Sequence, residues 1–453
     1  MTDMVKNELI KTKIPWTPYA PIGWDIKRAK FIFKSKKEIN SQMQCNDRLA
    51  LTLKGVIDRF EGDNIGLNPN DLRTYQIFQP NELVFKLLDL DNKKTSRVGF
   101  VHKKGIMSSA YIRVLENPNM NMRYFYYQYF DLYQRFIFND IGQGVRATMS
   151  SSDLLNIPIL IPPLETQNAI VNYLDRKTQQ IQEFIQKKER LIELLEEKKD
   201  KQITNAISKG VLQNIEFKDT GEVWLNEIPK HWEFKALKHY VRLNVASITE
   251  RTNPNYLLKY IDIGNVTFSG LLNEPEEMIF AIAPSRARRI VNSGDTILST
   301  VRTYLKAIAF FEKAEENLIA STGFAVLSPK RQIIPKYLKY LLSSSYFLHK
   351  VNFWAIGVNY PSINNDRLMA IKVAIPPTLK EQKEIIEFIE MGLEKYNKTI
   401  SKAQLEIEKA KEYQESLITQ VVSGQLKVPE KTYSNVHYRE FDMVAEQGSS
   451  YHT

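Results

Sequence analysis

The chain has 453 residues, 43% hydrophobic and 25% charged, which is typical of a folded protein with more than one domain. Lysine and arginine outnumber aspartate and glutamate by 62 to 52, so the net charge is +10, which favours a polyanionic partner, nucleic acid before membrane. The single cysteine, Cys45, excludes a disulfide framework and a thiolate metal site, and no run approaches the ~20 apolar residues of a membrane span.

Residues 1–160 are predicted to form a mixed α/β domain. The first fifteen residues lack the apolar core of a secretory signal, so we expect a cytoplasmic protein with no membrane partner. An aromatic-rich stretch, 122–138, repeats its large residues at helical spacing, which favours core packing over base stacking. Strands are predicted where β-branched and aromatic residues cluster, at 82–88, 97–103 and 110–115.

The segment 161–217 is predicted to be dominated by one long helix. It opens with "IPPLETQ" (161–167), in which two prolines precede the helix and Glu165 lies at the positive end of the helix dipole. Apolar residues then recur at helical spacing over 165–208. At 1.5 Å per residue this helix would be roughly 66 Å long.

The same order returns in the second half of the chain. Residues 218–374 form the second α/β domain, with a predicted helix at 336–353 and strands at 295–301, 306–311 and 323–328. "IPPTLKEQ" (375–382) then introduces a second long helix, 380–423, within the segment 375–426. A polar tail, 427–453, completes the chain, and its start is expected to lie near Trp16.

Residue-by-residue matches indicate that the two halves are copies. Trp16 and Trp24 keep the spacing of Trp224 and Trp232, and Ile161 corresponds to Ile375. "IGQGVRATMSSSDLLNIPILIPP" (141–163) also matches "IGVNYPSINNDRLMAIKVAIPP" (356–377). The pattern predicts a duplicated chain of domain, helix, domain, helix, with an approximate two-fold axis.

The long helices carry a seam that steps alternately by three and four residues, which is typical of a coiled coil. If each helix runs between the two domains, the pair is antiparallel and holds the domains apart by about two turns of DNA, at ~34–36 Å per turn. The predicted helix-pairing residues are Ile181, Ile185, Ile192, Leu195, Ile386, Ile389, Leu393, Tyr396, Ile400, Ile407, Leu417 and Val421.

These features resemble the specificity subunit of type I restriction-modification systems. The resemblance rests on "DTGEVWLNEIPKHWEFKALK" (219–238), on the 357–382 stretch and its copy at 142–167, and on the two long helices. It implies two α/β target recognition domains, each reading one half of a split, asymmetric sequence in double-stranded DNA. It also implies that the helices set the spacing and dock two adenine-methyltransferase subunits, which carry S-adenosylmethionine, and through them ATP-driven restriction subunits.

No chemistry is predicted in the chain itself, so we expect neither catalytic residues, cofactor nor metal. "NPNY" (253–256) lacks the second proline of an adenine-methyltransferase loop, and "GQG" (142–144) falls short of a phosphate-binding fingerprint. No paired spacing suggests a metal site among the six histidines: His102, His231, His239, His349, His437 and His452. The alternative function is a non-catalytic coiled-coil scaffold with two protein-binding heads.

DNA contacts are predicted in loops, because base edges need polar or basic side chains and phosphates need cations. For each loop the alternative is that these are solvated turn residues. Similarly, Lys187, Lys188, Glu196 and Glu197 lie either on a partner surface or on a solvent-facing side of the helix. The predicted DNA-binding residues are Lys93, Lys94, Arg97, Gln143, Arg146, Thr148, Ser150, Arg286, Arg288, Arg289, Arg302, Lys306, Asn359, Tyr360, Ser362, Asn364 and Asn365.

Overall fold

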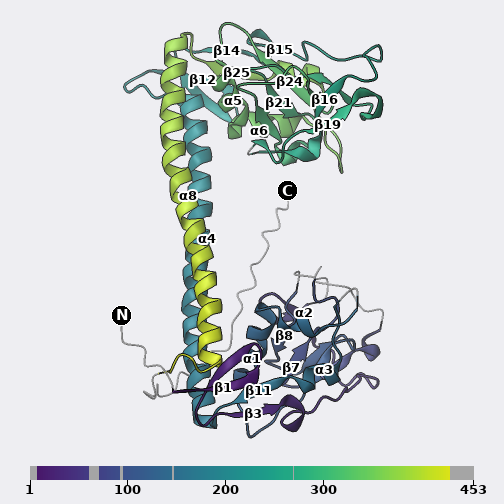
Figure 1. The fold of residues 1–453 in the computed structure, drawn as a ribbon. Helices are drawn as coiled ribbons and strands as arrows, with labels where there is room; N and C mark the ends of the chain where they lie inside the picture. Colours follow the sequence, from purple (N-terminus) through teal and green to yellow (C-terminus); the bar gives the residue numbers. More distant parts are fainter. Residues whose placement is uncertain (1–7, 61–70, 92–94, 145–146, 269, 429–453) are drawn as a thin grey trace. The chain divides into compact units, whose positions relative to one another are not determined.

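A computed structural model describes residues 8–60, 71–91, 95–144, 147–268 and 270–428, which divide into two compact units (Figure 1). Unit 1 comprises Met1–Gln186 and Glu406–Thr453, and unit 2 comprises Lys187–Leu405. Each unit is mixed α/β, as predicted. Unit 1 is therefore built from both ends of the chain, whereas unit 2 is one continuous segment.

The described residues of unit 1 form two small sheets and two strand pairs. Its three-stranded sheet has the order β10 (Ile112–Val114), β7 (Leu83–Phe85), β8 (Val98–Phe100). Its four-stranded sheet has the order β5 (Gly55–Arg59), β4 (Arg48–Thr52), β9 (Gly105–Met107), β6 (Gln76–Phe78). The strand pairs are β1 (Leu9–Ile14) with β2 (Thr17–Pro21) and β3 (Asp25–Arg28) with β11 (Pro158–Ile161). The shorter helices are α1 (Met122–Gln134), α2 (Ile137–Ile141) and α3 (Ser151–Asn156).

Unit 2 repeats this architecture, with one further strand, β15 (Val241–Leu243), in the first sheet and one further strand pair, β17 (Val266–Thr267) with β18 (Gly270–Leu271). Its sheets have the orders β15, β24 (Phe324–Pro329), β21 (Thr296–Ser299), β22 (Ile308–Phe310) and β19 (Glu276–Ile279), β16 (Leu257–Ile261), β23 (Leu318–Ser321), β20 (Ala287–Ile290). The other strand pairs are β12 (Phe217–Glu222) with β13 (Leu225–Pro229) and β14 (Glu233–Ala236) with β25 (Lys372–Ile375). The shorter helices are α5 (Pro335–Ser343), α6 (Ser345–Trp354) and α7 (Asn365–Ala370).

Two long helices, α4 (Leu164–Lys209) and α8 (Leu379–Val422), agree with the predicted bounds to within a residue. Within unit 1 the start of α4 lies beside the end of α8, and within unit 2 the end of α4 lies beside the start of α8, so the helices are antiparallel (Figure 1). Every predicted helix-pairing residue is buried or half-buried. In unit 2 a side-chain bond crosses the pair, from Gln202 Nε2 to the Phe388 carbonyl (3.0 Å).

Both long helices complete the hydrophobic core of each unit. In unit 1, Ile170, Val171 and Leu174 of α4 join Leu417 and Val421 of α8 in one cluster with α1 and the three-stranded sheet. In unit 2 the corresponding residues are Ile203, Ala206, Ile207, Ile385 and Ile389. Because these apolar side chains are shared, neither α/β domain has a complete core without both helices.

The repeated Pro-Pro motif ends in a glutamine that ties each long helix to its domain. Gln167 Nε2 donates to the Pro162 carbonyl (2.8 Å), and its Oε1 accepts from the Asn121 amide at the start of α1 (2.9 Å). Gln382 makes the equivalent bonds to the Pro376 carbonyl (3.3 Å) and the Ile334 amide at the start of α5 (2.9 Å). Both side chains are buried and satisfied, which explains why the motif occurs twice.

Candidate nucleic-acid interface

The predicted loop of unit 2 is a short hairpin fixed to the end of a strand. Ile356 and Ser362 exchange two backbone hydrogen bonds, of 2.8 and 2.9 Å. The Ile363 amide then donates to the Thr300 carbonyl (2.9 Å), directly after β21. The exposed side chains of Asn359, Tyr360 and Ser362 are thereby held on a defined backbone.

Unit 1 carries the equivalent hairpin at the equivalent place. Gln143 and Thr148 exchange two backbone hydrogen bonds of 3.0 Å, and the Met149 amide donates to the carbonyl of Leu87, two residues after the end of β7 (3.0 Å). Gln143 is exposed and Thr148 half-buried. The predicted contact Arg146 lies outside the described residues. The two hairpins thus share their backbone anchors and differ in their side chains.

Each hairpin leads into a helix whose first side chain acts as a cap. Ser150 Oγ accepts from the Asp153 amide (3.2 Å), and the Ser150 amide donates back to the Asp153 carboxylate (2.8 Å), which lowers the pKa of Asp153. Asn364 Oδ1 accepts from the Arg367 amide (2.8 Å). Such caps contribute about 0.5–2 kcal/mol to helix stability. In the free chain the side chains of Ser150 and Asn364 therefore stabilise the first turns of α3 and α7. Asn365, the next predicted contact, is exposed.

The second predicted segment of unit 2, 299–306, lies against the hairpin. Val301 pairs with Ser362, and the Arg302 guanidinium stacks over the Tyr360 ring at 4.8 Å. Arg302 and Lys306 both have positive φ angles, 48° and 52°, and bracket the short 3₁₀ turn Thr303–Leu305. Two segments about sixty residues apart in sequence therefore form one exposed surface with a cation and an aromatic ring in contact.

The charge of Lys306 acts on Asp200 of α4. Burial raises the pKa of the Asp200 carboxyl, and the positive charge of Lys306 partly offsets this rise. Lys306 is exposed, so its charge remains accessible at the edge of the surface that Arg302 and Tyr360 form.

In the corresponding segment of unit 1, 91–97, the predicted contact Arg97 is buried. Arg97 is only 1% exposed, and its Nη2 donates to the Asp89 carbonyl (2.6 Å) inside the unit. The prediction of Arg97 as a DNA contact is therefore wrong for this conformation, because its guanidinium stabilises the loop from within. Lys93 and Lys94 lie outside the described residues.

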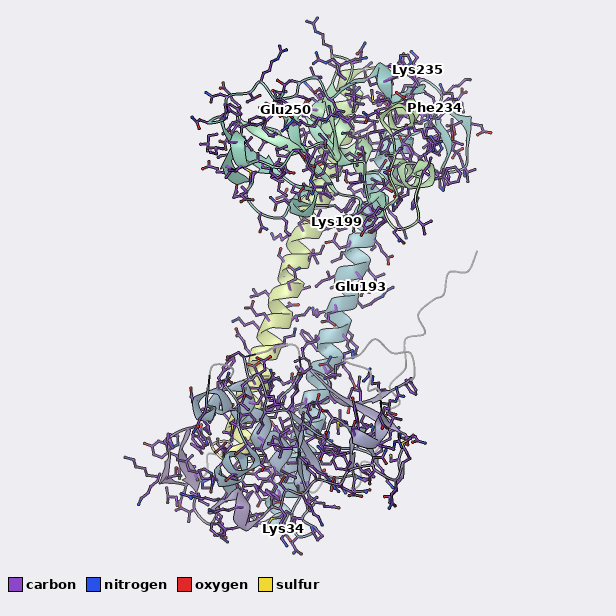
Figure 2. All side chains as sticks on the ribbon, turned by 90° about the vertical axis from the view of Figure 1, so that its right-hand side faces the viewer. Lys34, Glu193, Lys199, Phe234, Lys235 and Glu250 are labelled. Atoms are coloured by element: carbon purple, nitrogen blue, oxygen red, sulfur yellow. The ribbon has the colours of Figure 1, made fainter. Side chains whose placement is uncertain are left out.

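The basic run 285–289 divides into one exposed and two half-buried arginines. Arg288 donates to the Glu250 carboxylate (2.6 Å) and lies over the Phe280 ring at 5.2 Å; Glu250 is labelled in Figure 2. Arg289 contacts Ser247 Oγ at 3.4 Å. Arg286 alone of the three is exposed and is the best placed for a phosphate.

Sequence reasoning missed the apolar residues of the same surface. Val358 is 98% exposed, Tyr304 53% and Ile356 62%. Its sequence context could have identified Val358, because it lies between Gly357 and Asn359 in a polar loop that has no periodic apolar face to bury it.

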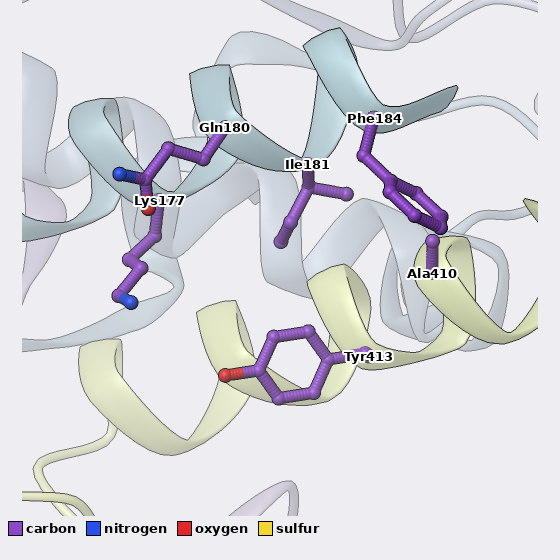
Figure 3. A pocket seen from close by; sticks show the side chains of 6 residues that line it. All are labelled: Lys177, Gln180, Ile181, Phe184, Ala410 and Tyr413. Carbon is purple, nitrogen blue, oxygen red and sulfur yellow. The ribbon is translucent and has the colours of Figure 1, made fainter. Parts of the chain in front are cut away.

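The helix pair of unit 1 carries a groove of about 300 Å³ between α4 and α8 (Figure 3). It is lined by Lys177, Gln180, Ile181, Phe184, Ala410 and Tyr413. The rings of Phe184 and Tyr413 are 40% and 49% exposed. In unit 2, by contrast, Glu193 and Lys199 of α4 (Figure 2) belong to short-range ion pairs with Arg190 and Glu196.

The described residues offer neither a metal site nor a membrane span. No group of three or more His, Cys, Asp or Glu side chains in those ranges could hold a metal ion. Nor is any helix in that part of the chain long and apolar enough to cross a membrane.

Comparison with known families assigns the fold and its repeat. A model of the family described as the type I restriction modification DNA specificity domain matches residues 70–205 and 229–409, one match on each copy of the repeat. These matches cover more than half of the chain. The chain therefore belongs to the family of type I restriction-modification DNA specificity proteins.

The chain is also similar to individual proteins. The putative type I restriction enzyme MjaX specificity subunit of Methanocaldococcus jannaschii is 28% identical over 179 residues, which span 36% of this chain and 40% of the relative. A structure described under "complex assembly and conformational transition of the type I R-M system" has a TM-score of 0.66 at 14% identity, covering 90% of this chain and 99% of that one. The HsdS subunit from Thermoanaerobacter tengcongensis has a TM-score of 0.49 at 15% identity, covering 90% and 98%.

Proposed function

We propose that the chain is the non-catalytic, DNA-reading subunit of a type I restriction-modification complex. Each α/β domain reads one half of a bipartite, asymmetric site in double-stranded DNA. The observation that carries this proposal is the pair of hairpins, 143–148 and 356–362, which have the same backbone anchors and different exposed side chains. Two domains with one scaffold and two sets of polar groups suit two different half-sites.

The long helices set the spacing of the half-sites and dock two adenine-methyltransferase subunits, through which restriction subunits join. The groove of unit 1 supports this part of the proposal, because Phe184 and Tyr413 expose aromatic surface along its lining. Aromatic anchors of this kind contribute most of the binding energy in many protein interfaces.

A map of N6-methyladenine tests the proposal. Cells expressing this chain with the methyltransferase encoded beside it are compared with cells that express the methyltransferase alone. We expect a split motif, methylated only when this chain is present. If the methyltransferase is expressed, this chain is soluble and no motif is methylated, the scaffold alternative is favoured instead.

A further inference from the structure

The tip of the unit 2 hairpin presents an apolar side chain with no neighbour to cover it. Val358 is 98% exposed and follows Gly357, whose φ of +121° makes the tight turn. Ile356 and Tyr360, on the same hairpin, are 62% and 66% exposed. An isolated exposed valine is ordinary, but here three apolar side chains of one anchored loop are exposed together.

This surface is held in place before any partner arrives. The hairpin is closed by the two Ile356–Ser362 bonds, and Ile363, directly after it, is 3% exposed within the core of unit 2. Pro361 restricts the backbone next to Tyr360. The position of Val358 is therefore fixed by the fold, which is a requirement for a residue that discriminates between similar partners.

The chemistry around Val358 is that of a DNA contact. Arg302 stacks on Tyr360 at 4.8 Å, and Asn359, next to Val358, is exposed. A cation and an amide beside an apolar tip match a base-pair edge and its phosphate better than an apolar protein groove. The major groove admits a two-stranded ribbon, and the apolar group that it displays is the C5-methyl group of thymine.

We propose that Val358 is a specificity-determining residue that contacts the C5-methyl group of a thymine in the half-site read by unit 2. The inference rests on the proposed function and deepens it, because it assigns one residue to one chemical group. Residues 218–374 exchanged with those of a relative identify which half of the motif belongs to unit 2.

The test removes only the methyl group. The full chain with its methyltransferase subunits is titrated with duplexes containing the methylated motif, in which each thymidine of the unit 2 half is replaced singly by deoxyuridine. At one position we expect the affinity for DNA to fall about fourfold, because the contact then buries one CH₂-sized apolar group less. Val358→Ala lowers the affinity for the thymidine duplex by a similar factor and then binds the two duplexes equally.

A matched control separates this effect from a general change of surface. Val223 is also nearly fully exposed, at 81%, in the turn between β12 and β13 of the same unit. We expect Val223→Ala to bind as the unaltered complex does and to keep the preference for thymidine. Because both valines are exposed, neither substitution should disturb folding.

Three results would overturn the inference. Deoxyuridine could be tolerated at every position, or Val358→Ala could keep the thymidine preference. Alternatively, Val358→Ala could weaken co-purification of the methyltransferase while leaving the preference intact, which would assign the tip to a protein contact. A complex that methylates no motif at all would instead refute the proposed function, and the inference with it.

Discussion

Buried glutamines connect sequence to fold at the scale of single residues. Gln382 is fully buried, and its amide bonds three backbone groups: the Ile334 amide and the carbonyls of Gln332 and Pro376. Its bonds explain a glutamine where the heptad pattern alone would accept any apolar residue.

Gln382→Ala should therefore lower the free energy of unfolding of unit 2 by about 1–3 kcal/mol, because the Ile334 amide loses its acceptor in a buried place. Chemical denaturation followed by far-UV circular dichroism measures the change. Lys383→Ala, at the exposed neighbouring position, serves as the control and should have little effect. Equal stability of the two variants would contradict the assigned role.

Asp131 of α1 gives a pH-dependent prediction. Burial raises the pKa of its carboxyl, which accepts hydrogen bonds from Thr419 of α8 and from Arg135. The pKa in the unfolded chain is lower, about 3.9. Between the two values the folded state holds more protons, so the Asp131 contribution to stability falls as pH rises through that window.

Asp131→Asn removes this titration. Relative to the unaltered protein, the variant should gain stability as pH rises from about 4 towards neutrality. Unfolding free energies of both proteins at a series of pH values test the prediction, since contributions from other groups cancel in the difference. A difference that stays constant with pH would refute it.

At the scale of elements, both long helices end in the same way. Gly210 after α4 and Gly424 after α8 have φ angles of +69° and +70°, and each lies against a tryptophan, Trp232 or Trp24. A Cβ at position 424 would lie 2.8 Å from the Trp24 ring and also meet Pro21. The end of α8 therefore packs against β2 and Trp24, near the start of the chain. Val428 and Trp16 belong to the same hydrophobic cluster of unit 1.

Gly424→Ala should destabilise unit 1 for two reasons, the positive φ and the overlap with Trp24 and Pro21. Gly23→Ala is a matched control, because Gly23 has a φ of +86° and nothing within 4 Å of an added Cβ. The first variant should be less stable than the second by about 1–3 kcal/mol, measured by thermal unfolding. Similar losses would mean that close packing at the helix end contributes nothing.

The groove of the helix pair predicts where a methyltransferase subunit binds unit 1. Phe184→Glu places a charge on the aromatic lining and should reduce co-elution of the methyltransferase at least tenfold, since burying an unpaired charge in an interface is costly. Gln186→Glu adds the same charge to the same helix at an exposed position outside the lining. If both variants bind alike, the groove is not part of the docking surface.

At the scale of the whole molecule, two units with the same core strand order in each sheet predict independent readout. Replacing residues 1–160 by those of a relative should change one half of the methylated motif and leave the other half intact. Replacing 218–374 should do the reverse. Sequencing of methylated DNA from both chimaeras tests this, and a motif that changes in both halves after one exchange would contradict it.

The repeat made the large features of this fold predictable from sequence. Proline pairs and a heptad seam depend on local rules, so the bounds of α4 and α8 agree with the structure to within a residue. The four-stranded sheet β5–β4–β9–β6 was not predicted, because only one of its pairings, β4 with β5, joins strands adjacent in the chain. Two of its strands, β6 and β9, are only three residues long, which is too short to show a period.

The candidate site was predictable as a set of loops but not residue by residue. The match between the two halves of the chain located both hairpins. The direction of each side chain, however, depends on tertiary packing, which cannot be read from the sequence. Arg97 illustrates this, since an arginine in a basic loop looks exposed until its loop turns inward. Val358 illustrates the converse, because valine in a sequence suggests a core position.

The division of unit 1 between the two ends of the chain has a consequence for biosynthesis. Unit 2, residues 187–405, is continuous and can fold as soon as it leaves the ribosome. The first segment of unit 1 precedes unit 2, but its core requires Leu417, Ile418, Val421 and Val422, which are synthesised after the whole of unit 2. During translation the apolar face of the first α/β domain therefore stays exposed while the whole of unit 2 is synthesised. Unit 2 can complete its core before unit 1 does.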